Sequence, residues 1–283
     1  MSEEKREVPE MEVTDYTDPQ CPFCVEAYTK DNVKPIDVQR VITKLDEYLG
    51  RNDYAAAERH LKYWDAEARQ GNDLRGEFSL AEELMGLYRK LGRKEEAISY
   101  AEKAVHYIDR IGLQGTVSAA TAMLNAATVY KAFGAPERGI SLFEEARRIY
   151  EEKLPKEDSR VAGLYNNFAL ALADLKRFDE ARDLYQKALD IVLSAEGGEP
   201  EAAITFLNLA SLAEAQFGLE KAEKEIEGHL EHAEYLLKKE GVRKDGNYAF
   251  VADKCAPVFG YYGWFGVEAD LKAEAERIYG ENR

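Results

Sequence analysis

Two cysteines near the N-terminus are the residues whose types and spacing could do chemistry. In Cys21-Pro22-Phe23-Cys24, two thiolates can share a metal ion or close a redox disulfide. A redox pair needs a helix N-terminus that lowers its thiol pKa, whereas this pair follows an acidic stretch. Tetrahedral zinc needs two further ligands, and the only sources are Cys255 and one of His60, His106, His229 or His232. We therefore favour an inert leader, or a strand packed on the first helices, over a metal or thiol sensor, and we expect no cofactor.

The second candidate for metal binding is a histidine pair. His229 and His232 lie three residues apart on an expected helix, but the same segment carries Leu230, Leu236 and Leu237, so a packing or surface role is favoured. No local motif combines a nucleophile, a base and an orienting group, and no glycine-rich phosphate loop follows a strand. The sequence therefore predicts a protein that is not an enzyme.

Composition and charge limit the partners. Hydrophobic residues make up 45% of the chain and charged residues 33%, a balance that predicts folding. The 54 acidic and 38 basic residues give a formal charge of -16, which repels nucleic acid and anionic lipid and favours basic or neutral partners. No stretch approaches about 18 apolar residues, and the first ten residues lack the apolar core of a signal peptide. We therefore expect a cytoplasmic protein that does not bind membranes.

Glycines mark a repeat along the chain. Gly50, Gly92, Gly134 and Gly218 lie on a 42-residue grid whose missing point is Lys176. Glycine suits the left-handed conformation at a helix C-terminus, and small side chains let two helices approach closely, so each interval predicts a helix, a tight turn and a second helix. The small residues that follow each grid point by four or five positions are Ala55, Ala97, Gly139, Ala181 and Ala222.

Apolar residues around these turns follow the period of an amphipathic helix, as in Leu84, Leu87, Tyr88 and Leu91. The pattern predicts all-α structure with helical hairpins over residues 36–70, 74–112, 116–154, 158–195, 200–240 and 247–280. We expect three parts: an acidic, disordered leader over 1–35, five hairpins over 36–240, and an aromatic-rich capping hairpin over 241–283.

The segment from Gly163 to Ile191 resembles a tetratricopeptide repeat. Its residues at that family's apolar and small anchor positions are Phe168, Ala169, Phe178, Ala181, Tyr185 and Ala188. The 42-residue period exceeds the usual length of about 34 and is similar to the longer repeats of kinesin light chains. The resemblance implies a right-handed superhelical solenoid of about six antiparallel helix hairpins, with a concave groove lined by the first helix of each pair. Repeat one departs most from the pattern, with Asp46 where Tyr88 and Tyr130 stand in repeats two and three.

Three asparagines recur with the repeat. Asn125, Asn167 and Asn208 are separated by 42 and 41 residues. A side-chain amide offers donors and an acceptor that match the backbone of an extended peptide, and in tetratricopeptide repeats that bind peptides, asparagine at the matching position often has this role. The resemblance therefore implies a non-catalytic scaffold that clamps a protein segment or peptide in its groove. The alternative is that each amide only ties its helix to the next repeat.

Further side chains share the expected face by helical spacing and mix polar, charged and apolar groups. They are Thr121, Thr128, Lys131, Asn166, Leu170, Asp174, Ser211 and Glu214. Basic residues are too few for a clamp on a peptide's C-terminal carboxylate. A second class of function is a peptide-responsive regulatory protein, which would act through a protein partner because the acidic leader lacks a helix-turn-helix.

Residues 248–265 differ from the rest, with seven aromatic residues in eighteen positions. The favoured interpretation is that these aromatics fold over the last repeat and close its core. The alternative is an exposed patch for homodimerisation or partner capture. Gly260, Gly263 and Gly266 would bare one helical face, and Pro257 would kink or end the helix that contains Cys255.

Overall fold

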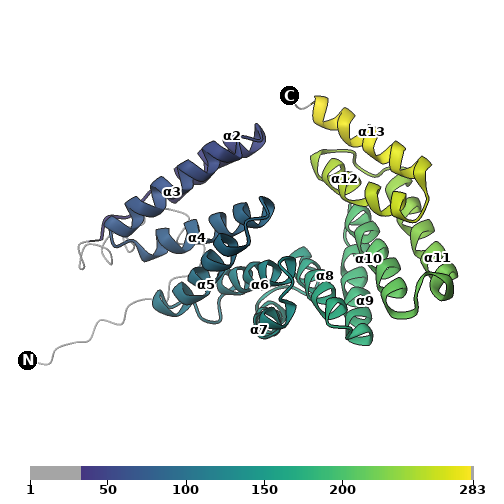
Figure 1. Ribbon diagram of the computed structural model, residues 1–283, viewed down its shortest axis with the longest axis horizontal. Coiled ribbons are helices and arrows are strands. Elements are labelled where there is room, and N and C mark those ends of the chain that lie inside the picture. Colours follow the sequence, from purple (N-terminus) through teal and green to yellow (C-terminus); the bar gives the residue numbers. More distant parts are fainter. Residues whose placement is uncertain (1–32, 282–283) are drawn as a thin grey trace, which may run out of the picture. The chain divides into compact units, whose positions relative to one another are not determined.

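The computed structural model describes residues 33–281, and within that range it is entirely helical (Figure 1). The all-α class is thereby confirmed. The elements are α2 (Val38–Gly50), α3 (Tyr54–Gln70), α4 (Leu74–Lys90), α5 (Lys94–Arg110), α6 (Val117–Ala132), the 3-10 helix η2 (Pro136–Gly139), α7 (Ile140–Lys153), α8 (Ser159–Asp174), α9 (Phe178–Ser194), α10 (Glu199–Phe217), α11 (Leu219–Lys238), α12 (Gly246–Tyr261) and α13 (Phe265–Glu281).

The chain divides into two compact units between Ile149 and Tyr150. In the first unit, α3 packs on α2 and α4, while α4 also packs on α5 and α6. In the second unit, α10 packs on α8, α9, α11 and α12, and α13 packs on α12. Each helix thus contacts near neighbours in the sequence, which is the packing of a helical solenoid.

Several helices begin at an acidic side chain. Asp37, Asp53 and Asp73 each accept a hydrogen bond from the backbone N–H three residues later, at 2.9–3.0 Å. These bonds satisfy amides that have no partner inside the helix and fix where α2, α3 and α4 start.

The tight turns between paired helices use a residue with positive φ. Gly92 and Gly134 have φ of 69° and 75°, and Lys176, the missing point of the glycine grid, adopts the same conformation at φ 60°. In the first repeat the expectation is wrong: Gly50 lies inside α2, and Asn52 takes the left-handed conformation at φ 56°. Asparagine tolerates this conformation, so the turn lies two residues after Gly50, at a position that no glycine marks in the sequence.

The shifted turn changes the register of repeat one. Asp53 N–H donates to Tyr48 O as Arg93 N–H donates to Tyr88 O, both at 2.9 Å. Tyr48 is therefore the equivalent of Tyr88, and the expected departure at Asp46 is wrong. The small-residue position is likewise taken by the buried Ala57 instead of the exposed Ala55.

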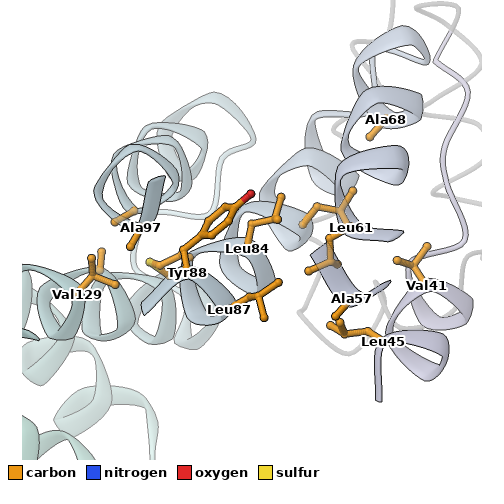
Figure 2. Packing of buried hydrophobic residues seen from close by; sticks show 14 of the residues in the cluster. Val41, Leu45, Ala57, Leu61, Ala68, Leu84, Leu87, Tyr88, Ala97 and Val129 are labelled. Atoms are coloured by element: carbon orange, nitrogen blue, oxygen red, sulfur yellow. The ribbon is translucent and has the colours of Figure 1, made fainter. Parts of the chain in front are cut away.

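Apolar side chains from successive helices form one layer in the first unit (Figure 2). Leucines on α3 and α4 fill it, and alanines such as Ala97, which is fully buried, let α5 approach closely. Burial of each large aliphatic side chain stabilises the fold by roughly 1.5–3 kcal/mol. The residues labelled in the figure are Val41, Leu45, Ala57, Leu61, Ala68, Leu84, Leu87, Tyr88, Ala97 and Val129.

The C-terminal aromatics divide between core and surface. Tyr248 and Phe259 are buried, whereas Phe250, Tyr261 and Phe265 are 52%, 69% and 68% exposed. These aromatics therefore close the core of the terminal hairpin and still present three large rings to solvent.

Pro257 was expected to kink or end the helix that contains Cys255, and the structure excludes an end, because α12 continues to Tyr261. Pro257 and Asp253 are both exposed, so water can satisfy the carbonyl that loses its helical partner. The three glycines do not share a face either, because Gly263 forms the turn at φ 81° and Gly266 belongs to α13.

Candidate functional site

Helix α6 carries four of the predicted binding residues, all in the first unit. Thr121, Thr128 and Lys131 are half-buried, and Asn125 is exposed. The hydroxyls of Thr121 and Thr128 donate to Val117 O and Leu124 O of the same helix, at 3.0 and 2.8 Å. Both threonine donors are therefore used within α6, and the Asn125 amide is the group that this face offers outward.

The Asn125 amide hydrogen-bonds to the carboxyl group of Glu82 on α4. Burial raises the pKa of Glu82 to about 8, the neighbouring carboxylate of Glu83 raises it further, and the Asn125 bond opposes the shift. Burial also raises the pKa of Glu83, with a smaller contribution from Asp46 on α2. The first unit thus joins one predicted residue to an acidic group on the preceding repeat.

Sequence reasoning missed Glu82 and Glu83, although the repeat contained a signal. Glu83 stands 42 residues before Asn125, so it occupies the same repeat position as the asparagines. The position recurs but the residue type does not, since a carboxylate stands where the later repeats carry an amide.

Helix α8 places Asn166, Asn167, Leu170 and Asp174 in the second unit. Asn167 Nδ2 donates to Gly163 O of its own helix at 2.8 Å. Asn166 Nδ2 donates instead to Thr205 Oγ1 on α10 at 3.0 Å, and its Oδ1 is buried with no hydrogen-bond partner among the described residues. The residue that ties this repeat to the next is therefore Asn166.

Helix α10 carries Asn208, Ser211 and Glu214. Asn208 is half-buried, and among residues 33–281 no hydrogen bond to its amide is found, whereas the Ser211 hydroxyl donates to Leu207 O at 3.1 Å. The Glu214 carboxylate accepts 2.8 Å hydrogen bonds from the hydroxyls of Tyr261 and Tyr262. Of these three groups, Asn208 alone has no hydrogen bond to another described residue.

The residues considered for metal binding are not brought together in the described part of the chain. No group of three His, Cys, Asp or Glu side chains there could hold a metal ion. Cys255 is buried in α12, which raises its thiol pKa to about 12. The rings of His229 and His232 lie against Phe206, with centroids 6.0 and 5.0 Å away. Cys21 and Cys24 lie outside the described residues.

The fold defines a helical repeat protein, and comparison with known proteins gives the repeat class. Residues 160–234 and 86–107 match two family models that are both described as tetratricopeptide repeat. The chain is 26% identical over 120 residues to the Arabidopsis thaliana protein Kinesin light chain-related 1, over 42% of this chain and 19% of that protein. It is 36% identical over 89 residues to Protein HGV2 of Halocynthia roretzi, over 31% of this chain and 16% of that protein. The chain thus spans less than a fifth of either relative.

Among solved structures, the chain is similar to a variant of nearly identical tetratricopeptide-like repeats assigned to a kinesin light chain of Podosopora anserina. The TM-score is 0.50 at 18% identity, over 71% of this chain and 94% of the other, which shows the fold. The chain thus carries tetratricopeptide repeats over residues 160–234 and 86–107 and resembles kinesin light chains. Proteins of this class are generally protein-interaction scaffolds and typically non-catalytic. No helix in the described residues is long and apolar enough to cross a membrane.

Proposed function

We propose that this chain is a non-catalytic scaffold that binds a protein segment or extended peptide along the first helices of its repeats. The observation that carries the proposal is the half-buried amide of Asn208, which has no hydrogen-bond partner among the described residues. The Asn208 amide is not among the buried atoms without a partner, so it is open to water, and a ligand can replace that water without breaking a bond within the described residues. An extended backbone supplies the donor and acceptor that such an amide needs.

Asn125 supports the same function in the first unit. Its amide is exposed and meets Glu82, so a ligand N–H that approaches it finds a carboxyl group beside it. With Glu83 adjacent and a formal charge of -16 on the chain, this face favours a neutral or basic segment. Asn167 contributes less, because its amide already donates within α8.

A displayed library of random peptides, selected on the full chain, tests the proposal. Selected peptides should bind Asn125→Ala and Asn208→Ala roughly 2- to 10-fold more weakly, since each variant loses about one net hydrogen bond. Asn167→Ala should bind nearly as well as the parent and is the matched control, because its amide already donates within α8. Equal binding by the parent and the Asn125/Asn208 double variant would remove these residues from the site.

The exposed aromatics of the last hairpin favour a second contact surface. Tyr261 and Phe265 are more than two thirds exposed at neighbouring helix ends, and large exposed rings are enriched in interfaces. Homodimerisation through this surface predicts that Phe265→Ser shifts the chain to monomer in sedimentation equilibrium. An unchanged mass would rule out this contact.

A further inference from the structure

Helix α12 presents a row of exposed side chains in the second unit, here called the α12 row. It consists of Asn247, Phe250, Lys254, Pro257 and Tyr261, which follow one another by three or four positions and so lie on one face of the helix. All five are exposed, and the rings of Phe250 and Tyr261 are 52% and 69% exposed. Exposed rings gathered on one face are typical of a binding surface.

Two hydrogen bonds place the α12 row beside α10. Near the start of the row, Asn247 Nδ2 donates to Glu201 Oε1 at 2.8 Å. At its end, the Tyr261 hydroxyl donates to Glu214 Oε1, also at 2.8 Å. The two pairs are 46 and 47 residues apart in the chain, so α10 and α12 run parallel in a constant register.

This register brings two free hydrogen-bond donors to the same level. Lys254 follows Asn208 by 46 positions, which is the offset of Asn247 from Glu201. The Lys254 ammonium forms no ion pair within residues 33–281 and lies 5.7 Å from the centroid of the Phe250 ring. The α12 row therefore borders the Asn208 amide and adds a second group that can donate to a ligand's carbonyl oxygens.

The carboxylates beside the row already accept hydrogen bonds. Both oxygens of Glu214 accept from tyrosine hydroxyls, and Oε1 of Glu201 accepts from Asn247. A ligand rich in N–H groups would find few acceptors here, whereas a ligand that presents carbonyls without N–H groups would leave no donor unsatisfied. Proline is the residue that lacks the backbone N–H and keeps the carbonyl.

The rings suit the same ligand. The Tyr261 ring is held by its bond to Glu214 and by an edge-to-face contact with Tyr262, with centroids 4.9 Å apart. Proline-rich segments in the polyproline II conformation bind to surfaces lined by such rings, and their preformed shape lowers the entropic cost of binding.

Length and charge agree with this class of ligand. Phe250 and Tyr261 are 11 positions apart on α12, which corresponds to about 16 Å along the helix. A polyproline II segment rises about 3.1 Å per residue, so roughly six residues contact both rings. The formal charge of -16 on the chain disfavours an acidic ligand, and a proline-rich segment can be neutral.

We propose that the α12 row and Asn208 bind a proline-rich segment in the polyproline II conformation. Its proline rings pack on Phe250 and Tyr261, and its carbonyls accept hydrogen bonds from Lys254 and Asn208. This inference rests on the proposed function and names the class of ligand for the second unit.

Fluorescence anisotropy of labelled decaproline, titrated with the full chain, tests the proposal. The parent should bind decaproline at least about 10-fold more tightly than a glycine-serine peptide of equal length, which lacks the rings and the preformed shape. Phe250→Ala should weaken decaproline binding by about 5-fold or more. Lys254→Met keeps the aliphatic stem but loses the donors, and should weaken binding by roughly 2- to 10-fold. Absence of saturable decaproline binding by the parent would overturn the proposal.

Phe265→Ser is the matched control, because Phe265 is 68% exposed but belongs to α13, outside the row. It should leave the affinity for decaproline unchanged. Phe250→Ala and Lys254→Met alter exposed side chains, so both variants should keep the circular dichroism spectrum of the parent. Equal decaproline affinity of the parent and Phe250→Ala would remove the α12 row from the site.

The peptide library separates this inference from the proposed function. Selected peptides that lack proline but bind Asn208→Ala more weakly would overturn the inference and leave the scaffold function intact. The absence of any binder, decaproline included, would remove both. If Phe250→Ala converts a dimer to a monomer in sedimentation equilibrium, the row contacts a second copy of the chain and the proposed ligand is wrong.

Discussion

Tyr262 donates a 2.8 Å hydrogen bond to Oε2 of Glu214, a residue 48 positions earlier in the chain. The other carboxylate oxygen accepts from Tyr261. Glu214 was expected to line a binding face, but its carboxylate instead joins α10 to the end of α12. This contact attaches the aromatic terminus to the preceding repeat and withdraws one acidic group from any ligand.

Tyr262→Phe should lower the free energy of unfolding by about 1.5 kcal/mol, because a half-buried carboxylate loses a hydrogen bond. Tyr261 donates to the same carboxylate but is 69% exposed, so Tyr261→Phe should lower the free energy of unfolding by less than Tyr262→Phe does. Urea denaturation of the two variants gives the comparison. Equal losses of unfolding free energy in the two variants would show that the bond from Tyr262 stabilises the fold no more than the bond from Tyr261.

Ala181→Trp should lower the thermal midpoint through a cost of roughly 1–3 kcal/mol, because Ala181 is fully buried where α9 packs against its neighbours. Asp183→Trp adds the same ring on the exposed side of α9 and should leave the midpoint nearly unchanged. Calorimetry measures both. A midpoint that does not move in Ala181→Trp would mean that this repeat packs differently.

Glu82→Gln should change how stability depends on pH. Burial raises the pKa of folded Glu82 to about 8 from an unfolded value of 4.5, so its contribution is fully present below pH 4.5 and is lost as pH rises through 8. The free energy of unfolding of the variant minus that of the parent should therefore be larger at pH 9 than at pH 5. Denaturation at both pH values measures the difference, and Glu95→Gln, exposed on α5, should show no such gain.

His229→Gln should change how the stability of the fold depends on pH under acidic conditions. Burial lowers the pKa of folded His229 below 6.5, so its contribution is present above pH 6.5 and is lost as pH falls through the folded pKa. The parent should therefore lose stability below pH 6.5 more steeply than the variant. His232→Gln changes the more exposed neighbour on the same helix and is the control. If the stability of the parent and of His229→Gln falls equally as pH is lowered, the lowered pKa of His229 is contradicted.

The candidate site was less predictable than the helices. Spacing proposed Asn125 and Asn208, which the structure leaves exposed and half-buried respectively. The same spacing gave Asn167 equal weight, although its amide bonds to Gly163 O, and it overlooked Asn166, which contacts Thr205 on the next repeat. Adjacent asparagines on one helix differ by about 100° in direction, and only the position of the neighbouring helix decides which one meets a partner.

The sequence by itself determined the helix pairs and the all-α class. Helical periodicity, acidic caps such as Asp73 and the turn at Gly92 act over a few residues, and local backbone geometry is enough to express them. Only the tertiary structure decided the register of the first repeat, where Asn52 replaces the expected glycine, and the contacts of Glu82 and Glu214. Those contacts join residues more than forty positions apart, so they form only when the stacking of whole helices brings their side chains within hydrogen-bond distance.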